Sequence, residues 1–210
     1  MGTRDRWRRP GRTARVLDFD QLGAIWKACE EIAHPNATAI QLMMLTGARP
    51  GEVLSARWGD LRLDRWWTLP LSRTGVDHRI FLADRAWELT ARLTTRGTSR
   101  FLFPGRRGDG PITSVQHIKN RVASRAGVGP WKLHDLRRTF LSHLYCHCTV
   151  PSPVVTVCGG YSLERLGEQH LLRRRAYDAA CQQAWIAYGK LIEGVVEGRV
   201  GNVLPMCSAS

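Results

Sequence analysis

The 210-residue chain has few acidic residues and almost no lysine. Asp and Glu number 18 against 31 Lys and Arg, which gives a formal net charge of +13 at pH 7. A GC-rich genome would explain arginine in place of lysine, but it would not explain the shortage of acids. An excess of this size favours a polyanionic partner, most commonly nucleic acid, because basic side chains neutralise phosphates and release their counterions. The lysines are Lys27, Lys119, Lys132 and Lys190.

Long apolar runs are also absent. No run approaches the roughly 20 apolar residues that a membrane-spanning helix needs. The arginine-rich first 15 residues have no apolar stretch behind them, which argues against a secretory signal peptide. We therefore expect a cytoplasmic, nucleoid-associated protein without a membrane partner. A hydrophobic share of 43% and a charged share of 23% are ordinary for a globular protein, and the length suits one domain with its own core.

The six cysteines have no regular spacing, so the sequence predicts reduced thiols and no disulfide framework. Four possible metal ligands do lie close together, at His143, Cys146, His147 and Cys148. On a helix the first three share a face and Cys148 points elsewhere, whereas structural zinc sites usually draw ligand pairs from two separate segments. We therefore predict buried thiols and a partly exposed histidine here, with no metal and no other cofactor.

Hydrophobic periodicity predicts a mostly helical α+β domain. Asn36 is a good N-cap for a second helix, Gly47 is a good stop for it, and Pro50 suits the first turn of a third. Helices are expected after Asp18, over 36–46, from Pro50, and near 84–95, 113–126, 134–147 and 176–197.

Between residues 61 and 82 the apolar period changes to two, which predicts a small three-stranded antiparallel sheet. The alternating pairs are Leu61 and Leu63, Trp67 and Leu69, and Ile80 and Leu82. The expected organisation is a basic, disordered leader or linker stub over 1–17, a folded domain over 18–197 and a flexible tail over 198–210.

Two segments carry residues suited to chemistry on an anion. The first, 46–52, reads TGARPGE and places Arg49 in a glycine-bounded joint between two helices. The second, 133–140, reads LHDLRRTF, and its His134 and Arg137 are three residues apart at a helix start, so they project from one face. Taken singly, each segment has an ordinary interpretation, as a solvated corner or a polar helix surface.

Together, in this order and on either side of a small sheet, the two segments resemble the Ala-Arg-x-Gly-Glu and His-x-Leu-Arg boxes of the tyrosine recombinase (phage integrase) family. The resemblance covers about 15 to 195 and includes 57–61 (RWGDL), which looks like the family's segment leading into its sheet. It implies the family's DNA breaking and rejoining fold, mostly helical with a small three-stranded sheet. Arg57 and Arg138 are then expected to contact DNA.

The resemblance also implies an activity, namely DNA integration or recombination for a mobile element. Family members bind duplex DNA, cut one strand through a 3′-phosphotyrosine and rejoin the end to a new partner without a metal. They assemble as tetramers in synapsis, which implies self-association on DNA.

Individual roles follow from the matched positions. Arg49 and Arg137 match the two arginines that stabilise the pentacovalent phosphate, for which a planar guanidinium is well suited. His134 matches the histidine that hydrogen-bonds the scissile phosphate and assists proton transfer. Glu52 matches the acidic residue that braces the first arginine.

The sequence departs from the family pattern at three positions. Arg73 stands where the family has a lysine as general acid, and arginine hardly gives up a proton near pH 7; nearby His78 is an alternative donor. The family's second histidine or tryptophan falls on Gly160, and its nucleophilic tyrosine falls on His170.

Three explanations of the missing nucleophile stay open. Tyr177 is the nucleophile on a shifted helix, or His170 marks a loss of cleavage that leaves a catalytically inactive DNA-binding remnant, or the chain is a decayed copy. A different class, an RNA-binding or ribosome-associated basic protein, would need aromatic RNA-binding motifs, which we do not find.

Overall fold

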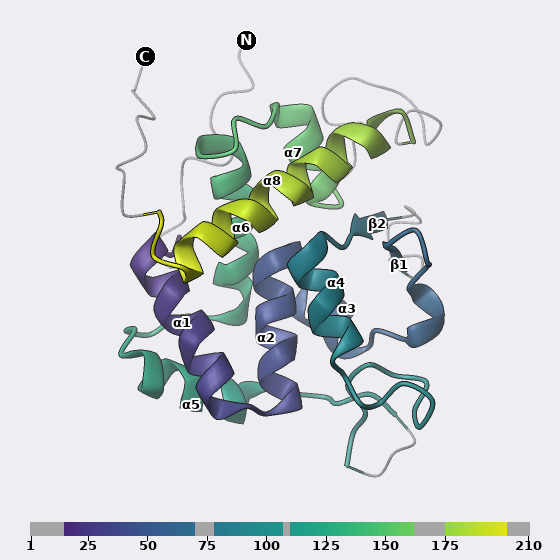
Figure 1. The fold of residues 1–210 in the computed structure, drawn as a ribbon, viewed down its shortest axis with the longest axis vertical. Coiled ribbons are helices and arrows are strands. Elements are labelled where there is room, and N and C mark those ends of the chain that lie inside the picture. The colour runs from purple at the N-terminus through teal and green to yellow at the C-terminus, as the bar shows by residue number, and fades with distance from the viewer. Residues whose placement is uncertain (1–14, 70–77, 107–109, 162–174, 201–210) are drawn as a thin grey trace.

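The structure is a computed structural model that describes residues 15–69, 78–106, 110–161 and 175–200. Over these ranges the domain is mostly helical with one small antiparallel sheet (Figure 1). The helices are α1 (Phe19–Ile32), α2 (Pro35–Thr46), α3 (Pro50–Leu54), α4 (Asp84–Ala91), α5 (Gln116–Ala126), α6 (Leu133–Cys146), α7 (Ser152–Cys158) and α8 (Asp178–Val196). The strands are β1 (Trp66–Leu69) and β2 (His78–Phe81), and short 3-10 turns cover Trp58–Asp60 and Arg175–Tyr177.

Local signals at the helix ends explain where the first two helices begin and stop. Asp18 caps α1 with a capping box, because its carboxylate accepts a hydrogen bond from the Gln21 N–H at 2.8 Å and the Gln21 side chain accepts one from Asp18. Gly47 ends α2 with a left-handed φ of 65°, as predicted. The predicted cap at Asn36 is wrong: His34 is the N-cap, and its Nδ1 accepts a hydrogen bond from the Asn36 N–H at 3.1 Å.

Helix α2 is the centre of the hydrophobic core. All of its residues from 39 to 46 are buried, and it packs against α1, α4, α5, α6 and α8. In Figure 1, α1 and α4 lie on either side of α2, and α8 crosses the layer that contains α6. Large aromatic side chains fill the space between α6, α8 and the sheet, with Phe140 stacked on Trp185 and edge-on to Tyr188. The core therefore fixes α2, α6 and α8 relative to one another.

The sheet has two strands in the described residues, so the prediction of three strands is wrong. Strand β1 pairs antiparallel with β2, with Trp67 opposite Ile80 and Leu69 opposite His78. Leu61 makes a single bridge with Trp67, and Leu63 is 90% exposed. The alternation at 61–63 leads into a turn closed by a hydrogen bond from the Arg65 N–H to the Arg62 carbonyl, and Arg65 takes a left-handed φ of 67°.

The chain packs on the domain from residue 15, earlier than the predicted boundary at 18. Arg15 donates hydrogen bonds to the carbonyls of Gly129 and Pro130 at 3.1 and 2.8 Å. Leu17 is fully buried, and its N–H donates to Thr139 Oγ1 at 2.9 Å. Residues 1–14 of the predicted leader and 201–210 of the predicted tail lie outside the described residues.

The histidine and cysteine cluster on α6 is part of the packing. His143 is buried against Phe19 and His147, and burial lowers the pKa of its imidazole to about 3. Cys146 and Cys148 are half-buried, so the prediction of buried thiols is wrong here, whereas His147 is partly exposed, as predicted. Across the part of the chain that the structure describes, no three His, Cys, Asp or Glu residues are grouped as metal ligands. No described helix combines the length and apolar character of a membrane span.

Candidate functional site

A pocket of about 690 Å³ lies where the N-terminal ends of helices meet the sheet. Gln116, the first residue of α5, and Leu133 and His134, the first two of α6, line one part of it, and Trp67 and Leu69 of β1 line another. The N-terminus of a helix carries partial positive charge and unpaired N–H groups. The ends of α5 and α6 therefore make this pocket favourable for an anion.

Arg49 lies on the pocket wall at the start of α3 and is held by Glu52. One Glu52 carboxylate oxygen accepts a hydrogen bond from the Arg49 backbone N–H at 2.7 Å, and the other accepts from the Arg49 guanidinium at 2.7 Å. The side chains are 38% and 20% exposed, respectively. Glu52 thus fixes both the backbone and the guanidinium of Arg49 through one carboxylate, and both residues line the pocket.

Arg137 is buried behind the pocket, with only 4% of the residue exposed. Its guanidinium donates hydrogen bonds to the carbonyl of Gly47 at 2.7 Å and to the carbonyl of Gly159, and it lies 5.3 Å from the centre of the Tyr161 ring. Burial lowers the pKa of Arg137; Tyr161 offsets part of this, and the charge of Arg49 adds to the lowering. Arg137 therefore connects α6 to the corner that precedes Arg49 and to the turn after α7.

His134 is one helical turn before Arg137 and is exposed at the pocket. Partial desolvation lowers its pKa below 6.5, and the positive charges of Arg137, Arg138 and Arg49 lower it further. The imidazole is therefore mostly neutral at pH 7, so one ring nitrogen can donate a hydrogen bond and the other can accept one.

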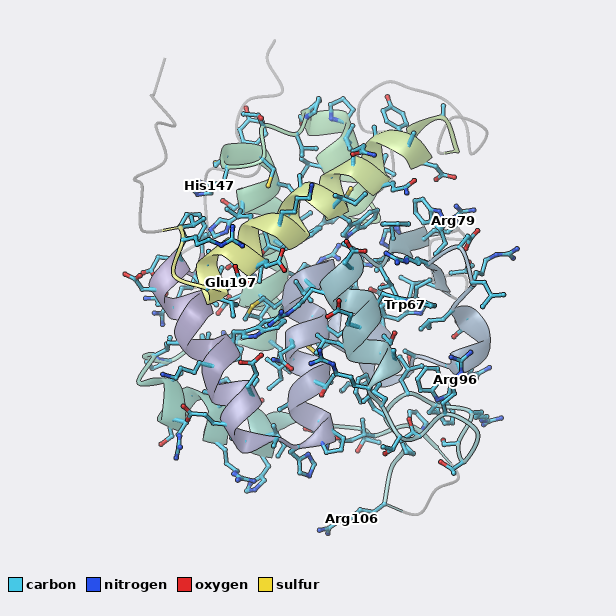
Figure 2. All side chains as sticks on the ribbon, viewed as in Figure 1. Trp67, Arg79, Arg96, Arg106, His147 and Glu197 are labelled. Atoms are coloured by element: carbon cyan, nitrogen blue, oxygen red, sulfur yellow. The ribbon has the colours of Figure 1, made fainter. Side chains whose placement is uncertain are left out.

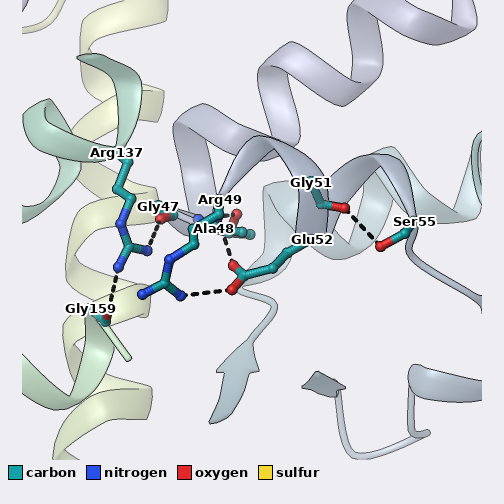
Figure 3. A network of polar contacts seen from close by, with 9 residues as sticks. Gly47, Ala48, Arg49, Gly51, Glu52, Ser55, Arg137 and Gly159 are labelled. Carbon is teal, nitrogen blue, oxygen red and sulfur yellow. Dashed lines mark hydrogen bonds and ion pairs between the residues drawn. The ribbon is translucent and has the colours of Figure 1, made fainter. Parts of the chain in front are cut away.

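The corner between α2 and α3 contains Arg49 and also binds Arg137. Figure 3 shows the guanidinium groups of Arg49 and Arg137 on the same side of this corner, with the Gly47 carbonyl bound to Arg137. A Cβ atom at Gly47 would lie 2.1 Å from the Phe140 ring, so only glycine fits there without a shift. The Trp185 indole N–H of α8 donates to the Thr46 carbonyl at 3.1 Å, which ties the corner to the last helix.

The two predicted DNA contacts lie next to the pocket and do not line it. Arg57 is exposed, with its guanidinium 5.6 Å from the centre of the Phe101 ring, and its backbone N–H donates to the pocket residue Asp60 at 3.2 Å. Arg138 is exposed on α6 and pairs with Asp135 at 2.8 Å. Their contact with DNA remains a prediction.

The positions that depart from the family pattern fall in different places. Arg73 and His170 lie outside the described residues. Gly160 follows the C-cap of α7 and has a left-handed φ of 57°. Tyr177 is half-buried and directly precedes Asp178, which pairs at 3.2 Å with Arg79 of β2, labelled in Figure 2. This ion pair joins the start of α8 to the sheet.

Sequence reasoning missed two groups that hold Arg137, the Gly159 carbonyl and the Tyr161 ring. Both follow α7, which was not predicted either. The segment 151–158 reads PSPVVTVC, and its run of four β-branched residues is atypical of a helix. The signal that could have revealed the end of this helix is the pair Gly159 and Gly160, which directly follows the apolar run 154–158.

Comparison with known proteins gives both a family match and curated relatives. A family model described as the phage integrase family matches residues 15–164, which is more than half of the chain. Prophage integrase IntF of Escherichia coli strain K12 is 29% identical over 165 residues, covering 75% of this chain and 35% of the relative. Prophage integrase IntZ of the same strain is 35% identical over 117 residues, covering 53% and 29%. The chain thus spans about a third of the length of these relatives.

Solved structures match the fold at low sequence identity. The integrase of mycobacterium phage Brujita has a TM-score of 0.64 at 19% identity, with 90% of this chain and 65% of that chain covered. The lambda integrase catalytic core has a TM-score of 0.55 at 21% identity, with 69% and 90% covered. XerH site-specific recombinase bound to its palindromic difH substrate gives 0.60 at 20%, with 78% and 52% covered. A mostly helical domain with a small two-stranded sheet matches the integrase catalytic core fold, and with the family match over 15–164 the chain belongs to the phage integrase family.

Proposed function

We propose that this protein is the catalytic domain of a site-specific DNA recombinase that cleaves and rejoins a DNA strand through a tyrosine. The observation that carries this proposal is the gathering of Arg49, His134 and Arg137. Arg49 and His134 line one pocket, and Arg137 lies one helical turn after His134 and donates to the carbonyl of Gly47, two residues before Arg49. These are groups that one backbone phosphate would need around it, because the phosphate gains negative charge in the transition state.

The two arginines suit different parts of that task. Arg137 lies in a buried setting, where hydrogen bonds to an anion are stronger than in water. Arg49 is paired with the Glu52 carboxylate and remains partly exposed, so a phosphate oxygen can reach the N–H groups of its guanidinium. The neutral imidazole of His134 can donate to a phosphate oxygen or take the proton that the nucleophile releases.

We propose Tyr177 as the nucleophile. Its neighbour Asp178 pairs with Arg79, and the residue before Arg79 in β2 packs on Gly160, next to the carbonyl that holds Arg137. In the proposed step the Tyr177 hydroxyl oxygen forms a bond to phosphorus and its proton passes to His134. The bond from phosphorus to the 5′-oxygen breaks, and that oxygen takes a proton from the protonated imidazole of His78.

Duplex DNA is the proposed partner, and we propose that the chain self-associates on it at the nucleoid. The net charge of +13 supports binding to a polyanion. Two of the solved relatives are described as XerH bound to difH and as a lambda integrase tetramer bound to a Holliday junction. No cofactor or metal enters the proposed reaction.

A second candidate function is DNA binding without cleavage. It is favoured by Gly160, which has no side chain, and by His170, which stands where the family pattern has its tyrosine. Such a protein would keep the basic pocket and lose the chemistry.

Covalent trapping separates the two candidates. The probe is a pool of randomised duplexes with nicks placed so that cleavage releases a short fragment and traps the protein on DNA. We expect a covalent adduct on a denaturing gel with the wild-type protein and with Tyr161→Phe, and none with Tyr177→Phe. Tyr145→Phe, at an exposed position of α6, is the control.

Each alternative has its own result. An adduct that survives Tyr177→Phe and disappears in Tyr161→Phe would move the nucleophile to Tyr161. No adduct from a wild-type protein that still binds the duplexes in filter assays, with a steep loss of affinity as salt rises, would favour the second candidate.

A further inference from the structure

A second histidine, His78, is buried on the sheet face that carries the pocket residues Trp67 and Leu69. His78 lies directly opposite Leu69 in the antiparallel pair of strands, and Trp67 lies opposite Ile80. Directly opposed residues and alternate residues of a strand project from the same face of a sheet. His78 therefore shares its face with Leu69 and Trp67, which line the pocket.

The His78 ring also fills the space next to Gly160. A Cβ atom built at Gly160 would lie 2.9 Å from His78 Cδ2 and 3.1 Å from both His78 Cγ and Nε2. The 2.9 Å contact is shorter than real Cβ atoms show, so a side chain at 160 would force the imidazole of His78 to shift from this place. The glycine, with its left-handed φ of 57°, is what admits the ring.

Gly160 stands between the two groups that hold Arg137. The carbonyl of Gly159 accepts a hydrogen bond from the Arg137 guanidinium, and the ring of Tyr161 lies under the same cation. The backbone of this turn is fixed, because the Gly160 and Tyr161 N–H groups donate to α7 carbonyls at 2.8 and 3.1 Å. The His78 ring is therefore packed on the one residue that separates the two partners of Arg137.

We propose that His78 is a further phosphate-binding residue of this site, and that its imidazole stands in the place that a side chain at 160 would otherwise fill. The sheet thus supplies a group that the turn after α7 does not carry. The inference rests on the proposed function, since it takes the pocket to hold a DNA backbone phosphate. The chemistry required is a ring N–H that donates to an oxygen of the phosphodiester already bound by Arg49 and Arg137.

Exchanging the two side chains tests this proposal. Removal of the ring in His78→Ala should weaken binding to a duplex by about tenfold, the effect of losing one charge-assisted hydrogen bond. Gly160→His alone should also bind poorly, because two rings then compete for one place. The double variant His78→Ala/Gly160→His should recover most of the affinity, since histidine is among the residues that accept a left-handed backbone.

The matched control is His78→Ala/Gly160→Ala, which carries a Cβ at 160 but no imidazole. It should stay as weak as His78→Ala. Equal recovery in both double variants would show that the place needs volume and not an imidazole, and this would overturn the proposal. Unchanged affinity in His78→Ala would overturn it as well, while wild-type binding would leave the proposed function standing.

A measurement on the wild-type protein removes any dependence on how the variants fold. In spectra of protein labelled with 15N-histidine, the His78 ring signals should shift on addition of the duplex, whereas those of His143, buried against Phe19, should not. A His78 signal that moves no more than the His143 signal would overturn the proposal. A wild-type protein that binds no DNA would overturn both this inference and the proposed function.

Discussion

The two arginines of the site are held in opposite ways. Arg137 is buried and donates to two backbone carbonyls, which carry no net charge. Arg49 is partly exposed and is paired with a carboxylate of its own helix turn. Arg137 therefore connects the α2–α3 corner to the turn after α7. The hydrogen bonds from Arg49 to Glu52, in contrast, join residues three positions apart.

This difference predicts that the two arginines contribute differently to the stability of the fold and to the reaction with DNA. A buried charge with fixed carbonyl partners is costly to remove, because its partners lose their hydrogen bonds inside the protein. An exposed ion pair contributes little to folding, and its arginine can exchange a carboxylate for a phosphate. We therefore expect Arg137 to act on both stability and DNA chemistry, and Arg49 to act on the chemistry alone.

The largest effect is expected for Arg137→Ala. The carbonyls of Gly47 and Gly159 lose their guanidinium donor, so the free energy of unfolding should fall by about 3 kcal/mol. Urea denaturation followed by circular dichroism measures this. The control is Arg138→Ala, at the next and exposed position, where a change under about 1 kcal/mol is expected. Similar losses in both variants would remove the contrast between buried and exposed arginines.

Gly47→Ala should be nearly as damaging, because this glycine joins the two arginine sites. Its left-handed φ of 65° costs an alanine about 1 kcal/mol, and the added methyl group forces the Phe140 ring to move, for a total of about 2–3 kcal/mol. Gly51→Ala, where nothing lies within 4 Å of the added carbon, should change stability by under about 0.5 kcal/mol. The urea concentration at the midpoint of unfolding, measured for both variants, tests this difference in stability.

The pH dependence of DNA binding tests whether His134 lies beside the bound phosphate. Desolvation and the charges of Arg137, Arg138 and Arg49 lower the pKa of His134 in the free protein. A bound phosphate would raise that pKa, so binding would take up a proton. Affinity should be flat above the pKa of the complex, rise by less than tenfold per pH unit as pH falls, and level off below the free pKa. Titrations at fixed ionic strength from pH 8 to 5.5 should show this, and His134→Gln should flatten the curve.

A small stability effect is expected for Arg49→Ala. The pair with Glu52 is partly exposed, so its loss should cost under about 1 kcal/mol, and a double-mutant cycle with Glu52→Gln should give a coupling of similar size. Covalent trapping should nevertheless fall by about a hundredfold or more, since one of the two arginines that meet the transition-state charge is gone. Unfolding as severe as that of Arg137→Ala would contradict the distinction between the two sites.

Local signals in the sequence were sufficient for much of the fold. Gly47 and Pro50 predicted the corner between α2 and α3, and the pattern 133–140 predicted a helix start with a polar face. Capping and periodicity act over a few residues, so they can be recognised without knowing the rest of the fold. The grouping of Arg49, His134 and Arg137 was inferred from family resemblance and not from spacing, and their catalytic roles remain predictions.

The remaining features depend on partners far along the chain. Arg137 is held by a carbonyl 90 residues away, and nothing near 137 in sequence indicates that contact. Helix α7 forms despite its β-branched residues because its apolar side chains are buried against the core, which overrides local propensity. The alternation at 61–63 predicted a strand, but an alternating pattern needs a paired neighbour along its length, and Leu63 has none in the described sheet.

One contact has a mechanical consequence, the hydrogen bond from the Trp185 indole of α8 to the Thr46 carbonyl. The same helix begins directly after Tyr177, so sliding α8 along its axis to reposition that tyrosine would pull this indole away from the residue next to Gly47. A shift of α8 would therefore also disturb the corner that positions the two arginines. The NMR resonance of the Trp185 indole proton would report such a shift, because it should move upfield when the hydrogen bond breaks.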